Sequence, residues 1–157
     1  MGNICRSPTA EGVVRTRLER VLREVGSGLV IELDSAGTHG YHAGQMPDRR
    51  AVDAARRRGI DLSAIRSRML SEEDFEAYDL ILAMDRDNLA HLEDLCPADL
   101  QHRLGLFMAF ARAADTDEVP DPYYGGLKGF DQVLDLVEEA ADGLIDEIIR
   151  RQRAGFP

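Results

Sequence analysis

The sequence contains no tryptophan and only two cysteines, Cys5 and Cys96, among 157 residues. Two cysteines are too few for the disulfide framework of a small secreted domain. No apolar run approaches the length needed to cross a bilayer. Cationic residues are also scarce, with 19 Lys and Arg against 29 Asp and Glu and a net charge of −10. We therefore expect a cytoplasmic protein that binds neither nucleic acid nor membrane and holds any anion in a local site.

A length of 157 residues with 44% hydrophobic and 31% charged residues predicts a single domain over residues 1–157. Apolar spacing and turn residues predict helices over 7–26, 48–58, 85–95 and 130–153, and strands over 29–33, 78–84 and the first half of 103–110. Strands that alternate with helices predict an α/β fold with a small parallel sheet. Ser7 is expected to cap the first helix, with Pro8 at its first position.

Ligand sites in parallel α/β folds lie where strands run into helices, which directs attention to residues 2–7 and to the loop 120–126. In the run Gly-Asn-Ile-Cys-Arg-Ser-Pro at 2–8, glycine permits a tight turn and a helix start offers free N–H groups to an anion. The planar guanidinium of Arg6 could bind two phosphate oxygens. An ordinary glycine turn beside a surface arginine explains the same heptapeptide, so these residues alone leave both interpretations open.

Residues 1–12, Met-Gly-Asn-Ile-Cys-Arg-Ser-Pro-Thr-Ala-Glu-Gly, resemble the active-site loop and first helix of the low-molecular-weight protein tyrosine phosphatases. The similarity continues nearly to the end of the chain, through 34–38, 47–52, 57–60, 84–89 and 121–125. The resemblance implies a four-stranded parallel sheet flanked by helices. It also implies hydrolysis of phosphotyrosine through a phosphocysteine intermediate, without a metal or organic cofactor.

The family's loop consists of a nucleophilic cysteine, five residues, an arginine and then Ser or Thr. Counting back from Arg6 puts the nucleophile before Met1, and the family's central first strand would precede it. Cys5 matches the family's second cysteine and is no substitute. Either the natural protein begins upstream, or the chain is a true truncation without phosphatase activity. We favour the first explanation and expect these 157 residues, as they stand, to be inactive.

The resemblance assigns catalysis to Arg6 and Asp121. Asp121 would protonate the leaving phenolate and then activate water, although an Asp-Pro pair is also a common surface turn. Asn3 would hold the loop in shape, in a left-handed conformation, and Ser7 would stabilise the thiolate. The expected substrate-binding residues are the loop residues Gly2, Asn3, Ile4, Cys5 and Ser7, and the aromatic walls Tyr41, Tyr123 and Tyr124.

Other functions compete with this interpretation. The chain could be a module that binds phosphate or phosphotyrosine without turnover, or a fragment that forms a homodimer through exposed sheet edges. Arsenate reduction, another use of the fold, needs a closely spaced cysteine pair that Cys96 does not provide. The four histidines lack metal-ligand spacing with either cysteine, so no metal site is expected. The substrate of the favoured interpretation is a phosphotyrosine protein or an aryl phosphate.

Overall fold

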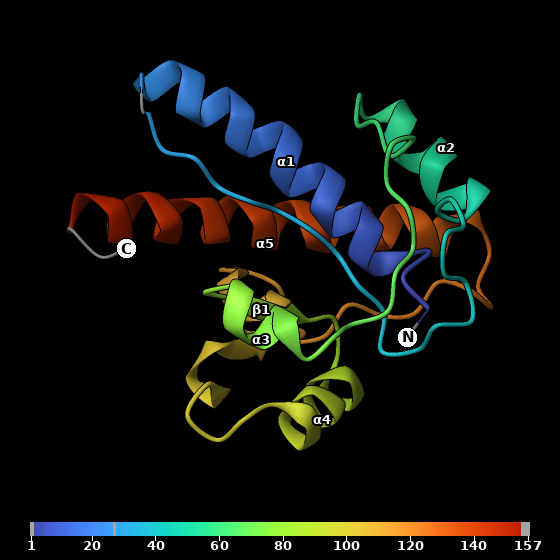
Figure 1. The fold of residues 1–157 in the computed structure, drawn as a ribbon. Helices are drawn as coiled ribbons and strands as arrows, with labels where there is room; N and C mark the ends of the chain where they lie inside the picture. Colours follow the sequence, from blue (N-terminus) through green and yellow to red (C-terminus); the bar gives the residue numbers. More distant parts are fainter. Residues whose placement is uncertain (1, 27, 155–157) are drawn as a thin grey trace.

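The computed structural model describes residues 2–26 and 28–154. Two long helices, α1 (Arg6–Val25) and α5 (Leu127–Arg153), lie on one side of a small parallel sheet (Figure 1). The shorter helices α3 (Glu73–Ala77) and α4 (Arg86–Leu95) lie on the other side, and α2 (Arg49–Arg57) packs against α1 and α5. The predicted α/β class, a small parallel sheet flanked by helices, is confirmed.

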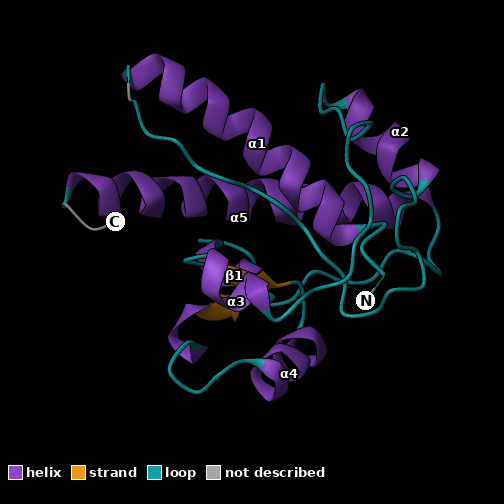
Figure 2. Ribbon diagram, in the orientation of Figure 1, coloured by secondary structure: helices purple, strands orange, loops and turns teal. Residues whose placement is uncertain are grey.

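The sheet consists of β1 (Ile81–Ala83) and β2 (Leu104–Leu106), which pair in parallel with Leu82 opposite Gly105 (Figure 2). Side chains alternate between its faces: Leu82 packs toward the helices α1 and α5, while Ile81 and Ala83 pack toward α3 and α4. The short 3₁₀ helices η1 (Gln101–Arg103) and η2 (Phe107–Phe110) flank β2. The described residues thus form two strands, where the family resemblance implied four.

The main core lies between α1 and α5. The apolar spacing of the last helix predicts one buried stripe, and six of its seven members are buried while Ile148 is half-buried; the six are Val133, Leu134, Val137, Ala141, Leu144 and Ile145. Phe130 and Ala140 are buried as well. Val13 and Val14 of α1 lie in the same cluster. Gly143 is required where α5 meets η2, because a Cβ atom there would overlap the carbonyl oxygen of Phe110. Close packing of these helices fixes the start of α1, where residues 2–7 lie, which we call the predicted phosphate loop.

The strand predicted over residues 29–33 is wrong. Leu29, Ile31 and Leu33 are half-buried and alternate with exposed Val30 and Glu32, as in a strand, but the segment belongs to no sheet. A cavity of about 780 Å³ borders this segment and also borders β1. None of the strands in the described residues pairs with this segment, and β-structure needs such a partner, so the apolar alternation alone does not produce a strand here.

The remaining predicted elements hold, with shifted ends. Gly26 ends α1 in the left-handed conformation with φ of 61°, and α2 starts after Asp48 and ends before Gly59. The strand expected over 78–84 is shorter, and the last helix begins earlier than expected. The expected cap at Ser7 is wrong, because α1 begins at Arg6 and the Ser7 hydroxyl bonds elsewhere. None of the described helices is long and apolar enough to cross a membrane.

Candidate active site

The backbone of residues 2–5 turns into the first turn of α1 and leaves its donors free. None of the main-chain N–H groups of residues 3–7 donates a hydrogen bond to any part of the chain that the structure describes. The helix dipole places positive potential at the same point. Free N–H groups at a helix N-terminus form an anion-binding site.

Asn3 holds this turn in an unusual conformation. Its φ is 57°, the left-handed conformation that the sequence predicted, and its side chain is buried. Its amide nitrogen Nδ2 donates to Ser7 Oγ at 2.9 Å and to Ser35 Oγ at 3.0 Å. Its amide oxygen Oδ1 accepts from the Arg68 N–H at 3.1 Å. Three partners from separate segments therefore keep the backbone in a conformation that few residues other than glycine adopt.

Donors outside the loop bind its carbonyl oxygens. The Ser67 hydroxyl donates to Gly2 O at 2.8 Å, and the Asp48 N–H donates to Ile4 O at 2.7 Å. These bonds fix both ends of the turn and occupy the carbonyl oxygens of Gly2 and Ile4. The loop thus presents donors rather than acceptors to a ligand, as an anion requires.

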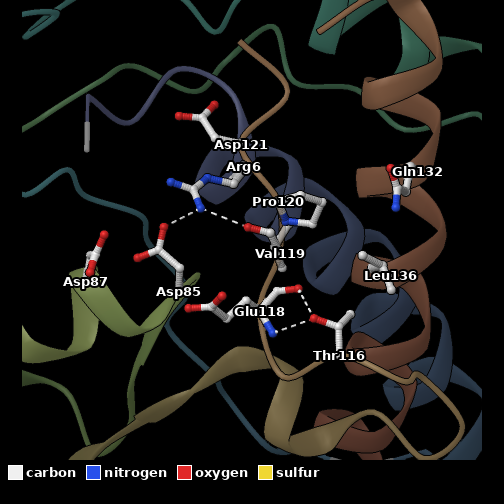
Figure 3. A pocket seen from close by; sticks show the side chains of 10 residues that line it. All are labelled: Arg6, Asp85, Asp87, Thr116, Glu118, Val119, Pro120, Asp121, Gln132 and Leu136. Atoms are coloured by element: carbon white, nitrogen blue, oxygen red, sulfur yellow. Dashed lines mark hydrogen bonds and ion pairs between the residues drawn. The ribbon is translucent and has the colours of Figure 1, made fainter. Parts of the chain in front are cut away.

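Arg6 is almost fully buried at the base of the loop. Its Nη1 donates to Asp85 Oδ2 at 2.6 Å and to the carbonyl oxygen of Val119 at 2.8 Å (Figure 3). Burial opposes ionisation of Asp85, but bonds from the Asn88 N–H and from Arg6 hold the pKa of Asp85 below its ordinary value. The Nε and Nη2 donors of Arg6 bond to no described residue. One side of the guanidinium is therefore anchored, and the other can bind two phosphate oxygens.

Asp121 lies beside Arg6 (Figure 3). It is exposed, and its Oδ1 accepts from the Tyr123 N–H at 3.0 Å. The Tyr123 and Tyr124 rings meet edge to face at 5.0 Å, and Tyr124 and Tyr41 are largely exposed. The structure brings every site residue named from the sequence to the wall of the 780 Å³ cavity: Gly2, Asn3, Ile4, Cys5, Arg6, Ser7, Tyr41, Asp121, Tyr123 and Tyr124.

Cys5 is 7% exposed and belongs to the main core cluster. Burial, followed by the negative charges of Asp48 and Asp121, raises its pKa to about 12. Such a thiol is neutral at physiological pH and cannot act as a nucleophile. Cys5 can therefore contribute its N–H to an anion, but not its sulfur to chemistry.

Four residues that hold the loop or Arg6 in place were not predicted as site residues from the sequence: Ser35, Asp48, Ser67 and Asp85. For two of these residues, the sequence position could have indicated the role. Asp85 follows β1, where parallel sheets place ligand residues, and Asp48 precedes an apolar helical pattern as a capping residue does. Ser35 and Ser67 reach the loop through tertiary contacts that no spacing in the sequence encodes. Within residues 2–26 and 28–154, no group of three metal-binding side chains comes together.

Comparison with known proteins agrees with this geometry. A family model described as low molecular weight phosphotyrosine protein phosphatase matches residues 1–154. A low molecular weight protein-tyrosine-phosphatase of Streptomyces coelicolor is 40% identical over 159 residues, covering 98% of this chain and 92% of that protein.

Solved structures show the same similarity. A protein tyrosine phosphatase from Entamoeba histolytica, with Hepes in its active site, superposes with a TM-score of 0.87 at 39% identity, covering 97% of this chain and 94% of that one. YfkJ from Bacillus subtilis superposes with a TM-score of 0.82 at 32% identity, covering 96% and 91%. The chain therefore belongs to the low molecular weight phosphotyrosine protein phosphatase family.

Proposed function

We propose that this protein hydrolyses phosphotyrosine through a phosphocysteine intermediate, with the nucleophile supplied by a cysteine directly before Met1. One observation carries the proposal: the free N–H groups of residues 3–7, the buried guanidinium of Arg6 and the carboxylate of Asp121 all border one cavity. These are the parts that transfer of a phosphoryl group to and from a thiolate requires.

In the proposed first step, the thiolate attacks phosphorus. A sulfur–phosphorus bond forms, the bond from phosphorus to the phenolic oxygen breaks, and protonated Asp121 gives its proton to that oxygen. Arg6 and the loop N–H groups bind the three equatorial oxygens as negative charge spreads over them.

In the second step, the Asp121 carboxylate takes a proton from water as the water oxygen attacks phosphorus. The sulfur–phosphorus bond breaks, which releases inorganic phosphate and restores the thiolate. Free N–H groups and Arg6 around the sulfur would hold the pKa of that added cysteine low, in contrast to buried Cys5. Asn3 and Ser7 would hold the loop around it, and Tyr41, Tyr123 and Tyr124 would form the walls for the phenyl ring.

The cavity itself supports a strand in front of that cysteine. It extends from the loop to α5, between β1 and segment 29–33, which belongs to no sheet of the described residues, and apolar side chains of α1 and α5 line it, including Val14, Leu144 and Ile148. An apolar strand there would lie between the two segments, offer hydrogen bonds to both and fill the space. We propose that residues preceding Met1 form this strand, because both the nucleophile and the filling of the cavity require it.

Without those residues, we propose that the 157-residue chain binds phosphate without turnover. Its uncovered sheet edges also offer a route to a homodimer. Arsenate reduction gains no support, because Cys5 and Cys96 lie in separate buried clusters. We place the enzyme in the cytoplasm, where a reducing environment keeps a catalytic thiolate free.

The intermediate provides a direct test. A version of the chain extended by a short apolar segment ending in cysteine is mixed with an aryl phosphate, quenched in acid and analysed by mass spectrometry. We expect a phosphoryl adduct on the added cysteine, and none when that cysteine is serine. An adduct on another residue, or hydrolysis without any adduct, would refute the mechanism.

A further inference from the structure

Arg50, which had no role in the sequence analysis, lies between the phosphate loop and the loop that carries Asp121. Its guanidinium carbon is 5.5 Å from the centre of the Tyr123 ring and 4.8 Å from the centre of the Phe130 ring. Phe130 is buried in the first turns of α5, and Tyr123 is two residues from Asp121. A cation at these distances is attracted to the faces of both rings.

The same guanidinium is held on the side of the phosphate loop. Asp48 Oδ1 accepts from Arg50 Nε at 3.0 Å, and Oδ2 accepts from Nη2 at 2.8 Å, which is the two-bond geometry that fixes an arginine most firmly. The backbone N–H of Asp48 in turn donates to Ile4 O of the phosphate loop. A continuous series of contacts therefore joins the phosphate loop to Tyr123. It runs through two residues, Asp48 and Arg50.

The loop 120–126 has few other attachments. Among the described residues, its hydrogen bonds lie within the loop or reach the adjoining first turn of α5, such as those from the N–H of Tyr123 to Asp121 and from the N–H of Gly125 to Pro122. Among described residues, Arg50 alone makes a ring contact or hydrogen bond to this loop from a distant segment of the chain. Before Asp121, the chain is held at Val119, whose carbonyl oxygen accepts from Arg6 Nη1 at 2.8 Å. Beyond Asp121, the contact between Arg50 and Tyr123 is the corresponding attachment, so Arg50 holds the part of the loop that follows Asp121.

We propose that Arg50 is a positioning residue that holds Asp121 at the distance from the phosphate loop at which it can protonate the leaving group. It contacts neither the phosphorus nor the transferred proton, and acts through the Tyr123 ring and the backbone between Tyr123 and Asp121. The proposal rests on the proposed function for the role of Asp121, but the anchoring itself is a property of the 157-residue chain.

The first experiment tests whether Arg50 anchors the loop 120–126, and it needs no catalytic activity. Backbone amide exchange is measured by NMR in the 157-residue chain and in Arg50→Met. Arg49→Met is the matched control, since the Arg49 side chain is 94% exposed and its ion pair within the described residues is a long one, to Asp53 at 3.9 Å. Loss of the cation–ring contact should speed exchange of the Tyr123 and Tyr124 amides about two- to fivefold. Arg49→Met should leave these rates unchanged. Unchanged rates in Arg50→Met, or equal acceleration in both variants, would overturn the proposal.

Arg50→Lys covers the case in which Arg50→Met fails to fold. Lysine keeps the positive charge but cannot form two parallel bonds to Asp48. It should loosen the loop in the same exchange measurement. Parent-like exchange in Arg50→Lys would show that charge alone suffices and would overturn the positioning role.

The consequence for proton transfer is tested in the cysteine-extended version. Misplacing an acid slows poor leaving groups more than good ones, so Arg50→Met should lower kcat/KM for phenyl phosphate about tenfold more than for 4-nitrophenyl phosphate. This extra loss should vanish when Asp121 is already alanine, because the two residues act as one unit. Equal losses for both substrates, or an undiminished effect in the Asp121→Ala background, would overturn it.

The proposed function and the positioning role of Arg50 can be refuted independently of each other. If the extended version hydrolyses neither substrate, the proposed function fails while amide exchange still decides the anchoring. If it hydrolyses both and Arg50→Met shows no selective loss, the proposed function stands and the positioning role falls.

Discussion

The burial of Cys5 distinguishes it chemically from any cysteine that the phosphate loop could activate. A pKa raised from 9.0 to about 12 reduces the thiolate fraction near neutral pH by roughly a thousandfold. Arg6 lies next in the chain, yet its anchored Nη1 donates to Asp85 and Val119, and its positive charge lowers the pKa of Cys5 by less than burial raises it. Two neighbours in sequence therefore differ in what they can do: the Cys5 thiol stays protonated, while the Arg6 guanidinium borders the cavity in which an anion would bind.

Cys5 should resist alkylation in the folded chain. We expect iodoacetamide at pH 8 to react with Cys5 at least about a hundredfold more slowly in the folded chain than in urea, because the folded thiol stays protonated. Mass spectrometry of the Cys5 peptide measures both rates, with Cys5→Ser as the assignment control. Stability that depends on the neutral thiol is complete below pH 9 and should decline as pH rises from 9 toward 12. Rapid modification of the folded chain would contradict the burial.

Asp121 should matter for turnover and not for binding. In the cysteine-extended version, Asp121→Ala is expected to lower kcat/KM for phenyl phosphate about 10²- to 10³-fold, since the leaving phenolate loses its proton donor. The affinity for benzylphosphonate, measured by calorimetry, should stay within about threefold. Asp115→Ala, at another exposed aspartate near the same loop, is the control. A loss of affinity as large as the loss of turnover would assign Asp121 to binding.

Helix α2 connects the phosphate loop to the rest of the molecule through its capping residue. Asp48 caps the helix at the Arg50 N–H and is bonded by the Arg50 side chain, and these bonds lower its pKa although burial opposes them. Because the folded pKa lies below the ordinary value of 3.8, the stabilisation is complete above that pH and is lost as pH falls further.

Asp48→Asn separates the charge from the cap, since asparagine also caps helices well. We expect the variant to be less stable than the parent at pH 7 and to lose less stability between pH 5 and pH 2. Urea unfolding at several pH values measures both effects. Parallel losses in parent and variant would show that the Asp48 carboxylate contributes nothing specific to folding.

Helix α5 depends on one glycine for its contact with η2. Gly143→Ala places a methyl group on the carbonyl oxygen of Phe110, so the two elements must separate. We expect a loss of about 1–3 kcal/mol, seen as a fall of about 3–10 °C in melting temperature. Gly129→Ala in the same helix, where a Cβ meets nothing closer than 3.4 Å, should cause no such fall. Equal melting temperatures for the two variants would contradict the packing.

Most helices could be predicted from the sequence because their signals are local. Apolar spacing identified α1, α4 and α5, and turn residues such as Gly26 and Gly59 marked the ends of α1 and α2. The strand expected over 29–33 could not form, because β-structure needs a partner that the described residues do not supply. The site was likewise predictable where residues are contiguous, as in 2–7. Its tertiary supports, Ser35, Ser67 and Arg50, were not, because they join segments far apart in the chain.

At the scale of the molecule, the described residues bring the predicted phosphate loop, an anchored arginine and an aspartate to the wall of one cavity, which continues along β1. The proposed mechanism needs a thiolate in front of Met1, and the cavity has room for the proposed strand in the same place. The proposed residues before Met1 would thus supply both the nucleophile for catalysis and the apolar side chains that fill the cavity.

The most direct test of where the nucleophile lies is hydrolysis of 4-nitrophenyl phosphate. It is measured for the 157-residue chain and for the version extended with an apolar strand and a cysteine. We predict no turnover above background by the shorter chain, and steady turnover by the extended one that is abolished when the added cysteine is serine. Equal activity of the two chains, or activity that survives the change to serine, would contradict the assignment of the nucleophile.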